Sequence, residues 1–135
     1  MVKKVLLIED DEFIRDLYKR QLDICDMFTY AFSNGADGLK SAQENQYDLI
    51  LLDIMLPGMN GLDVLRSLKQ NEKTKNIPVI MVSNLGQESV VKEGFALGAI
   101  GYLIKATFTP DQIVQEITKI FDQHSQSAQP PQAKG

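Results

Sequence analysis

The stretch that most constrains the fold is Leu49 to Gly58, where four consecutive aliphatic residues end in a carboxylate. Leu49 to Leu52 is bounded by polar and turn residues, a pattern typical of a strand buried on both faces inside a parallel sheet. Asp53 follows directly, and Pro57-Gly58 ends the apolar stretch. Ligands of open α/β sheets bind at the carboxyl ends of the strands, so Asp53 is a candidate functional residue. From this stretch alone, a local role as a helix N-cap or loop carboxylate stays open.

Other apolar runs repeat this arrangement. Three of them are followed by polar residues: Val5 to Ile8 by Glu9-Asp10, Val79 to Val82 by Ser83, and Gly101 to Ile104 by Lys105. A weaker strand candidate is Phe28 to Phe32. Helical patterns separate the strands over residues 13–25, 37–45, 62–68, 87–97 and 110–121. This alternation predicts a doubly wound (βα)5 domain of the flavodoxin-like α/β class with a five-stranded parallel sheet. We expect the strand order 2-1-3-4-5, because the two acid-tipped strands must be neighbours for their carboxylates to meet.

The chain has the length of a single domain. Its last helix has a clear start at Thr109-Pro110-Asp111-Gln112, which offers an N-cap, a first-turn proline and a capping-box glutamine. From Ser125 the sequence turns polar, so we expect residues 1–124 to form the domain and residues 125–135 a disordered tail or linker stub. In the first helix, Phe13 and Cys25 fall on the apolar side, and we expect Cys25 to be a small buried hydrophobe.

Charge and cysteine content exclude several classes of protein. The net charge of −4 disfavours direct binding to nucleic acid. A single cysteine excludes an internal disulfide framework and fits a reducing compartment. The apolar run near the N-terminus is too short for a signal peptide or a membrane span. We therefore expect a cytoplasmic protein that does not bind membranes.

The polar groups at the strand ends predict a phosphoryl site. Glu9, Asp10 and Asp53 would repel one another at one sheet edge unless a cation neutralised them. All-oxygen ligation without a nearby His or Cys favours Mg²⁺. Lys105 and Ser83 add a cation and a hydroxyl, which suit the oxygens of a phosphoryl group that Asp53 attacks as a nucleophile.

In this order and spacing, the chain resembles the receiver domain of bacterial two-component response regulators over about residues 3 to 122. Glu9-Asp10 resembles the family's acidic pair, Asp53 its phospho-accepting aspartate, and Ile54 to Gly61 its Pro-Gly loop. The resemblance implies Mg²⁺ ligation by Glu9, Asp10, Asp53 and the backbone carbonyl of Met55. It also implies that Lys105 and Ser83 assist phosphorylation and that Ser83 and Tyr102 form a conformational switch.

The same resemblance implies the partners. A sensor histidine kinase or phosphotransfer protein would supply the phosphoryl group, and a downstream protein would bind the face formed by residues 87–97, residues 101–104 and the last helix. The domain would not be an enzyme but would assist its own phosphorylation and dephosphorylation. We expect a monomer or a weak, phosphorylation-dependent dimer, since Ala99-Ile100-Gly101 lacks the acidic residues of receivers that dimerise through charged pairs.

Some residues depart from the common family pattern. Ala106 replaces a proline that usually follows the lysine, which leaves the geometry of the Lys105-Ala106 peptide open. Asn84 replaces a small residue, and its side chain is expected to crowd or hydrogen-bond the phosphoryl group. Met55 and Leu85 flank the path of a hydrolytic water, and both are apolar, which predicts a slowly decaying phosphoprotein.

Three alternative functions compete with a phospho-accepting receiver. A phosphorylation-independent, receiver-like scaffold remains open, although such domains usually lose site residues. A Mg²⁺-dependent phosphohydrolase with an aspartyl nucleophile is disfavoured, because Met55 stands where that class needs a general acid. A flavodoxin-like cofactor binder is disfavoured because the acidic residues 9–12 would repel a phosphate.

Overall fold

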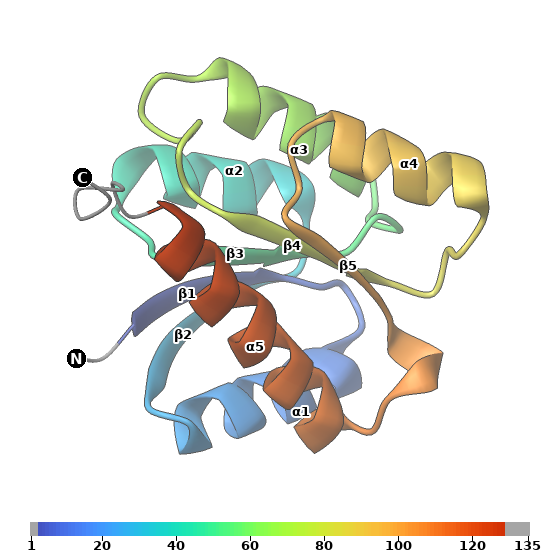
Figure 1. The fold of residues 1–135 in the computed structure, drawn as a ribbon. Coiled ribbons are helices and arrows are strands. Elements are labelled where there is room, and N and C mark those ends of the chain that lie inside the picture. The colour runs from blue at the N-terminus through green and yellow to red at the C-terminus, as the bar shows by residue number, and fades with distance from the viewer. Residues whose placement is uncertain (1–2, 129–135) are drawn as a thin grey trace.

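Parallel strands and helices alternate along the chain (Figure 1). The computed structural model describes residues 3–128. Its elements are β1 (Lys3–Ile8), α1 (Glu12–Ile24), β2 (Met27–Phe32), α2 (Gly35–Glu44), β3 (Leu49–Leu52), α3 (Gly61–Gln70), β4 (Val79–Ser83), α4 (Glu88–Ala96), β5 (Gly101–Ile104), the 3-10 turn η1 (Lys105–Thr107) and α5 (Pro110–Ala128). All neighbouring strands are parallel, in the order β2-β1-β3-β4-β5, which confirms the predicted fold and strand order.

The sheet is the middle layer of the domain. Helices α1 and α5 cover one face, and α2, α3 and α4 cover the other (Figure 1). Side chains alternate between the faces of a strand, so Leu49 and Leu51 pack toward α1 and α5, whereas Ile50 and Leu52 pack toward the other three helices. All four side chains are fully buried, which explains why β3 is apolar at every position.

Side-chain caps fix where the helices begin. The carboxylate of Asp11 accepts from the Ile14 N–H at 3.1 Å. In the same way, the Asn34 side chain accepts from the Asp37 N–H, and the Asn60 side chain accepts from the Asp63 N–H. The cap at Asn34 explains why α2 starts at Gly35, two residues before the predicted start. The predicted capping box is confirmed, since the Thr109 N–H donates to Gln112 Oε1 at 3.0 Å.

On α1, one residue of the predicted apolar side is exposed, and the predicted burial of Cys25 was wrong. Phe13 is 70 % exposed, because it lies in the first turn of α1, ahead of the part of the helix where Tyr18 and Leu22 are buried. Cys25 is exposed because α1 ends at Ile24 and Cys25 is its C-cap, where helical periodicity no longer fixes the direction of a side chain.

The end of the chain was only partly predictable. Helix α5 continues to Ala128, past the predicted start of the tail at Ser125. The remainder of that predicted tail, residues 129–135, lies outside the described residues. Within residues 3–128, no helix combines the length and the apolarity that crossing a bilayer requires.

Candidate functional site

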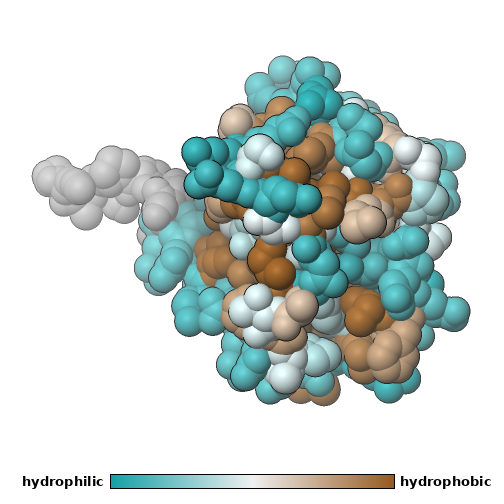
Figure 2. Space-filling view, turned by 90° about the vertical axis from the view of Figure 1, so that its right-hand side faces the viewer, coloured by the Kyte–Doolittle hydropathy of each residue, from teal (hydrophilic) through white to brown (hydrophobic). Residues whose placement is uncertain are grey.

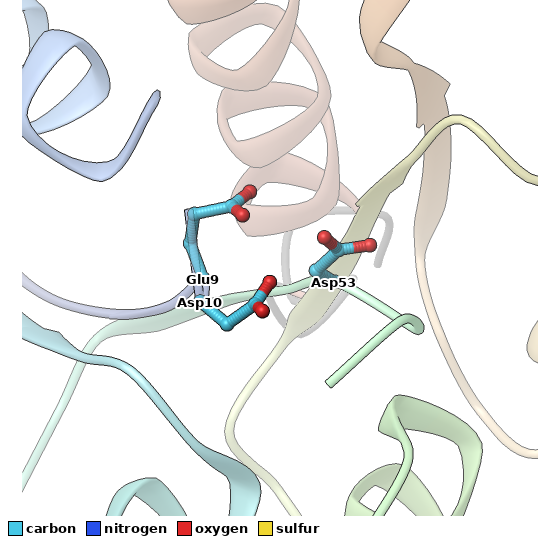
Figure 3. Close-up of side chains that lie close together, drawn as sticks. All are labelled: Glu9, Asp10 and Asp53. Carbon is cyan, nitrogen blue, oxygen red and sulfur yellow. The ribbon is translucent and has the colours of Figure 1, made fainter. Parts of the chain in front are cut away.

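The structure brings the predicted acidic residues together at the carboxyl ends of β1 and β3. Figure 3 shows the carboxyl groups of Glu9, Asp10 and Asp53 turned toward a common space. One oxygen from each lies within 4.8 Å of the others. Glu9 and Asp53 are only 2 % and 5 % exposed, whereas Asp10 is exposed. This is an acidic cluster with two buried members and one member open to solvent.

Lys105 balances the two buried carboxylates. Its Nζ lies 2.5 Å from Glu9 Oε1 and 2.7 Å from Asp53 Oδ2. Burial lowers the pKa of Lys105, but its bonds to the two carboxylates outweigh burial and hold the pKa above its ordinary value. Burial raises the pKa of Glu9, with the bonds from Lys105 and from the Asp11 N–H acting against it. One ammonium group shared by two buried carboxylates thus has a raised pKa itself but offsets the burial of Glu9 only in part.

The backbone orients Asp53. Its Oδ1 accepts from the N–H groups of Ile54 at 2.7 Å and Met55 at 3.3 Å, so Oδ2 is the oxygen that meets Lys105. Gly61 supports this turn by donating its N–H to the Ile54 carbonyl at 2.8 Å. A Cβ at position 61 would lie 2.0 Å from the carbonyl oxygen of Asp53, so only glycine fits this close approach.

Arg15 is a supporting residue that the sequence did not reveal. Its Nη1 donates to the backbone carbonyls of Glu9 at 2.9 Å and Asp10 at 3.3 Å, while the Asp11 N–H donates to Glu9 Oε2 at 3.0 Å. Arg15 therefore ties the first turn of α1 to the acidic pair. A cation one turn into the helix after an acidic loop is the only sequence signal for this contact.

Ser83 and Tyr102 meet at the loop after β4. The buried Ser83 hydroxyl accepts from the Leu85 N–H at 3.2 Å, and the Tyr102 hydroxyl donates to the Leu85 carbonyl. Burial raises the pKa of the Tyr102 phenol, and its ring lies beside Gly94 of α4. The loop that Ser83 and Tyr102 hold leads directly into α4.

The geometry after Lys105 is settled by the structure. Every peptide bond in residues 3–128 is trans, and Lys105 begins the turn η1. The Ala106 N–H donates to Asn84 Oδ1 at 2.8 Å, so Asn84 bonds to the neighbouring loop. A hollow of about 360 Å³ beside this bond is lined by Lys105, Asn84, Ala106, Asp11, Ile14, Tyr18, Phe108 and Pro110.

Hydrophobic surface interrupts the hydrophilic surface on this side of the molecule. Figure 2 looks onto the side toward which the carboxyl ends of the strands point, and it shows hydrophobic patches between hydrophilic ones. Two large, exposed hydrophobic residues follow β1 and β3 closely in the chain: Phe13, and Met55 at 60 % exposure. Leu85, by contrast, is half-buried against the core.

Comparisons with known proteins agree with this geometry. The chain matches the family model described as response regulator receiver domain over residues 5–118. It is 36% identical over 117 residues to the transcriptional regulatory protein SrrA of Staphylococcus aureus (strain NCTC 8325 / PS 47), a match covering 87% of this chain and 47% of SrrA. The chain thus spans about half the length of the curated relatives it matches.

Solved structures give the same result. The chain is similar to the chemotaxis response regulator CheY4 of Vibrio cholerae, with a TM-score of 0.82 and 25% identity over 89% of this chain and 99% of CheY4. It is also similar to the receiver domain of the Francisella response regulator 1452, with a TM-score of 0.80 and 28% identity over 90% of this chain and 98% of that one.

Proposed function

The chain belongs to the family of response regulator receiver domains, and from this premise we propose that Asp53 accepts a phosphoryl group from a sensor histidine kinase or phosphotransfer protein. One observation carries the proposal: the buried Asp53 carboxylate is oriented by two backbone N–H groups and paired with Lys105 at the carboxyl edge of the sheet. Receiver domains are signalling domains, so the proposed product is a phosphorylated protein.

The transfer forms one bond and breaks one bond. An oxygen of Asp53 bonds to phosphorus while the bond from phosphorus to the donor's histidine nitrogen breaks, and that nitrogen keeps the electron pair. Lys105 already lies 2.7 Å from Asp53 Oδ2, so its ammonium is placed to bind a phosphoryl oxygen without leaving the site. Ser83, at the end of the neighbouring strand β4, would supply a hydroxyl to another oxygen.

The acidic cluster fits a Mg²⁺ ion. Its donors are carboxylate oxygens within 4.8 Å of one another, and no histidine or cysteine belongs to the group among the described residues. Glu9, Asp10, Asp53 and the backbone carbonyl of Met55 would hold the ion. Bound there, Mg²⁺ would offset negative charge on the phosphoryl oxygens.

Ser83 and Tyr102 are proposed to report the change. Both contact Leu85 in the loop that leads into α4, so a movement of Ser83 toward a phosphoryl group would reach α4 through this loop and β5 through Tyr102. We propose that a downstream protein binds the face of α4, β5 and α5, and Phe95 of α4 is exposed. The proposal includes a cytoplasmic location, a monomer or weak phosphorylation-dependent dimer, and no direct contact of this chain with nucleic acid or membrane.

Phosphorylation is tested by intact mass measurement after incubation with a small phosphodonor and Mg²⁺. The wild-type chain should gain the mass of one phosphoryl group, and Asp53→Asn should gain none. Asp48→Asn is the matched control, because Asp48 is an exposed carboxylate just ahead of the same strand, at its amino end. Equal labelling of wild type and Asp53→Asn would refute the assignment, and no labelling of wild type would favour a phosphorylation-independent scaffold.

The metal site has a separate test. Removal of one carboxylate from an all-oxygen site should weaken Mg²⁺ binding, so Asp10→Asn should require a higher Mg²⁺ concentration in a titration followed by NMR chemical shifts. If Asp10→Asn titrates like the wild-type protein, Asp10 is not a ligand.

A further inference from the structure

Asn84 and Ala106 directly follow two of the proposed site residues, and a hydrogen bond connects them. The Ala106 N–H donates to Asn84 Oδ1 at 2.8 Å. Ser83 lies opposite Ile104 in the register of β4 and β5, so this bond lies just beyond the last pair of the ladder. It therefore links the loop after Ser83 to the turn that carries Lys105.

We propose that Asn84 is a positioning residue that holds these two loops in the arrangement of the resting protein and opposes their rearrangement upon phosphorylation. The inference rests on the proposed function, because it concerns how Ser83 and Lys105 respond to a phosphoryl group on Asp53. Asn84 acts through its neighbours and does not itself contact the reacting atoms.

On the β5 side, the bond satisfies a donor that has no other partner in its own turn. The first N–H groups of a 3-10 turn have no carbonyl to bind within that turn. Ala106 is the second residue of η1, and Asn84 Oδ1 caps it from the neighbouring loop. The residue before Ala106 is Lys105, which two carboxylates hold in place. One end of the bond is therefore anchored to the acidic cluster.

On the β4 side, the bond restrains the loop after Ser83, which moves in the proposed rearrangement. The Ser83 hydroxyl is occupied by the Leu85 N–H, and the Leu85 carbonyl is occupied by Tyr102. In the proposed rearrangement, Ser83 moves toward the phosphoryl group on Asp53 to donate its O–H, and the backbone at Asn84 shifts with it. Because Ala106 is anchored, that shift lengthens or breaks the bond between Asn84 and Ala106. The bond therefore stabilises the resting arrangement alone.

Binding of beryllofluoride, a phosphoryl mimic, in the presence of Mg²⁺ tests the inference. Asn84→Ala removes the acceptor, so the variant should bind the mimic more tightly than wild type, by roughly two- to tenfold, the range expected for loss of one hydrogen bond. Because the lost bond stabilises only the unbound protein, the melting temperature without the mimic should fall by a few degrees. Affinity that is unchanged or weaker in Asn84→Ala overturns the inference.

A second background isolates the hydrogen bond. Proline has no N–H, so in an Ala106→Pro background there is no bond to lose, and Asn84→Ala should leave the affinity unchanged. In an Ala106→Gly background the N–H is kept, and Asn84→Ala should tighten binding as in wild type. The same effect of Asn84→Ala in the proline and glycine backgrounds overturns the inference.

Amide exchange separates this inference from the proposed function. In the unbound protein, the Ala106 amide should exchange faster in Asn84→Ala and at the wild-type rate in Asn84→Asp, which keeps an oxygen acceptor. Unchanged exchange in Asn84→Ala overturns the bond itself. If wild type does not bind the mimic at all, the proposed function fails, whereas the exchange result still decides whether Asn84 restrains the turn after Lys105.

Discussion

The two halves of the candidate site are held in different ways. In the acidic half, which comprises Glu9, Asp10 and Asp53, backbone N–H groups bind the carboxylates of Glu9 and Asp53. Arg15 binds the backbone carbonyls of Glu9 and Asp10, and Gly61 packs directly against the backbone of Asp53. In the switch half, which comprises residues 83–85, Tyr102 and the turn η1, single side-chain hydrogen bonds hold the loop after β4 together and join it to β5 and η1. The first half suits a nucleophile and metal ligands that must stay in place. The second suits a response to the group they bind.

The largest expected effect comes from crowding the acidic half. Gly61→Ala should lower the free energy of unfolding by about 3 kcal/mol, because its Cβ would lie 2.0 Å from the carbonyl oxygen of Asp53 and the backbone must move to admit it. Chemical denaturation measures this loss. Phosphorylation should fall as well, since the displaced backbone is that of Asp53, the proposed phosphoacceptor.

Gly58→Ala is the matched control for Gly61→Ala. Gly58 has a positive φ of 74°, but nothing lies within 4 Å of the position of a Cβ there. Its replacement should cost only backbone strain, about 1 kcal/mol, and leave Asp53 in place. Equal losses in the two variants would show that the close approach at Gly61 does not support the acidic half.

Loss of the cation that holds the acidic pair should have the next largest effect. Arg15→Ala frees the carbonyls of Glu9 and Asp10 from a charged donor, and such bonds contribute about 1.5–3 kcal/mol. We expect Mg²⁺ binding to weaken roughly tenfold, as measured by titration followed by NMR. Lys19→Ala removes an exposed ion pair with Asp23 on the same helix and should leave Mg²⁺ binding unchanged. If Arg15→Ala binds Mg²⁺ as tightly as the wild-type protein, the acidic pair does not need the hydrogen bonds from Arg15.

A smaller effect is expected in the switch half. Tyr102→Phe removes the donor to the Leu85 carbonyl and should lower the free energy of unfolding by about 1 kcal/mol. Faster amide exchange should be confined to residues 84–88, and Mg²⁺ binding should not change. Tyr47→Phe removes a hydroxyl that is 2.6 Å from Ser41 Oγ and lies away from the site, so it should leave exchange at residues 84–88 unchanged. Faster amide exchange in β1 or β3 of Tyr102→Phe would contradict the claim that the two halves are held independently.

The two halves also differ in how far the sequence predicts them. The acidic cluster follows from fully buried strands with carboxylates at their ends, since the order β1-β3 leaves Glu9 and Asp53 as neighbours. The contacts that hold the switch half depend on the paths of two loops, and no periodicity encodes a bond such as that from Ala106 to Asn84. The sequence therefore predicts the residue types at the strand ends but not the bonds between the loops.

Periodicity also failed where elements end. The helical pattern placed Phe13 and Cys25 on the apolar side of the helix, but α1 has its buried residues only at Tyr18 and Leu22. A side chain in the first turn or at the C-cap lies where the neighbouring layer no longer covers it. Hydrophobic spacing defines a face, whereas the extent of the sheet below decides how much of that face is buried.

The last prediction concerns two side chains, one beside each half of the site. Hydrolysis of an aspartyl phosphate needs a water in line with the phosphorus, and Met55 and Leu85 flank that approach by resemblance to other receivers. Met55 follows the acidic half and is 60 % exposed, whereas Leu85 belongs to the switch half, is half-buried and is hydrogen-bonded through both its N–H and its carbonyl. Neither side chain can orient a water through a hydrogen bond, so we expect slow decay of the phosphoprotein.

Polar replacements at both positions should speed that decay. The double variant Met55→Asn/Leu85→Glu offers an amide and a carboxylate to the water, and we expect roughly threefold faster loss of the phosphoryl group, which corresponds to less than about 1 kcal/mol in the barrier. The rate is measured by intact mass after removal of the phosphodonor. Ile24→Glu, at an exposed apolar residue in the last turn of α1, should decay like wild type. If Leu85 moves with the loop after Ser83 as proposed, while Met55 stays in place, Met55→Asn alone should retain most of the acceleration. A double variant that decays no faster than wild type would mean that these two side chains do not exclude the water.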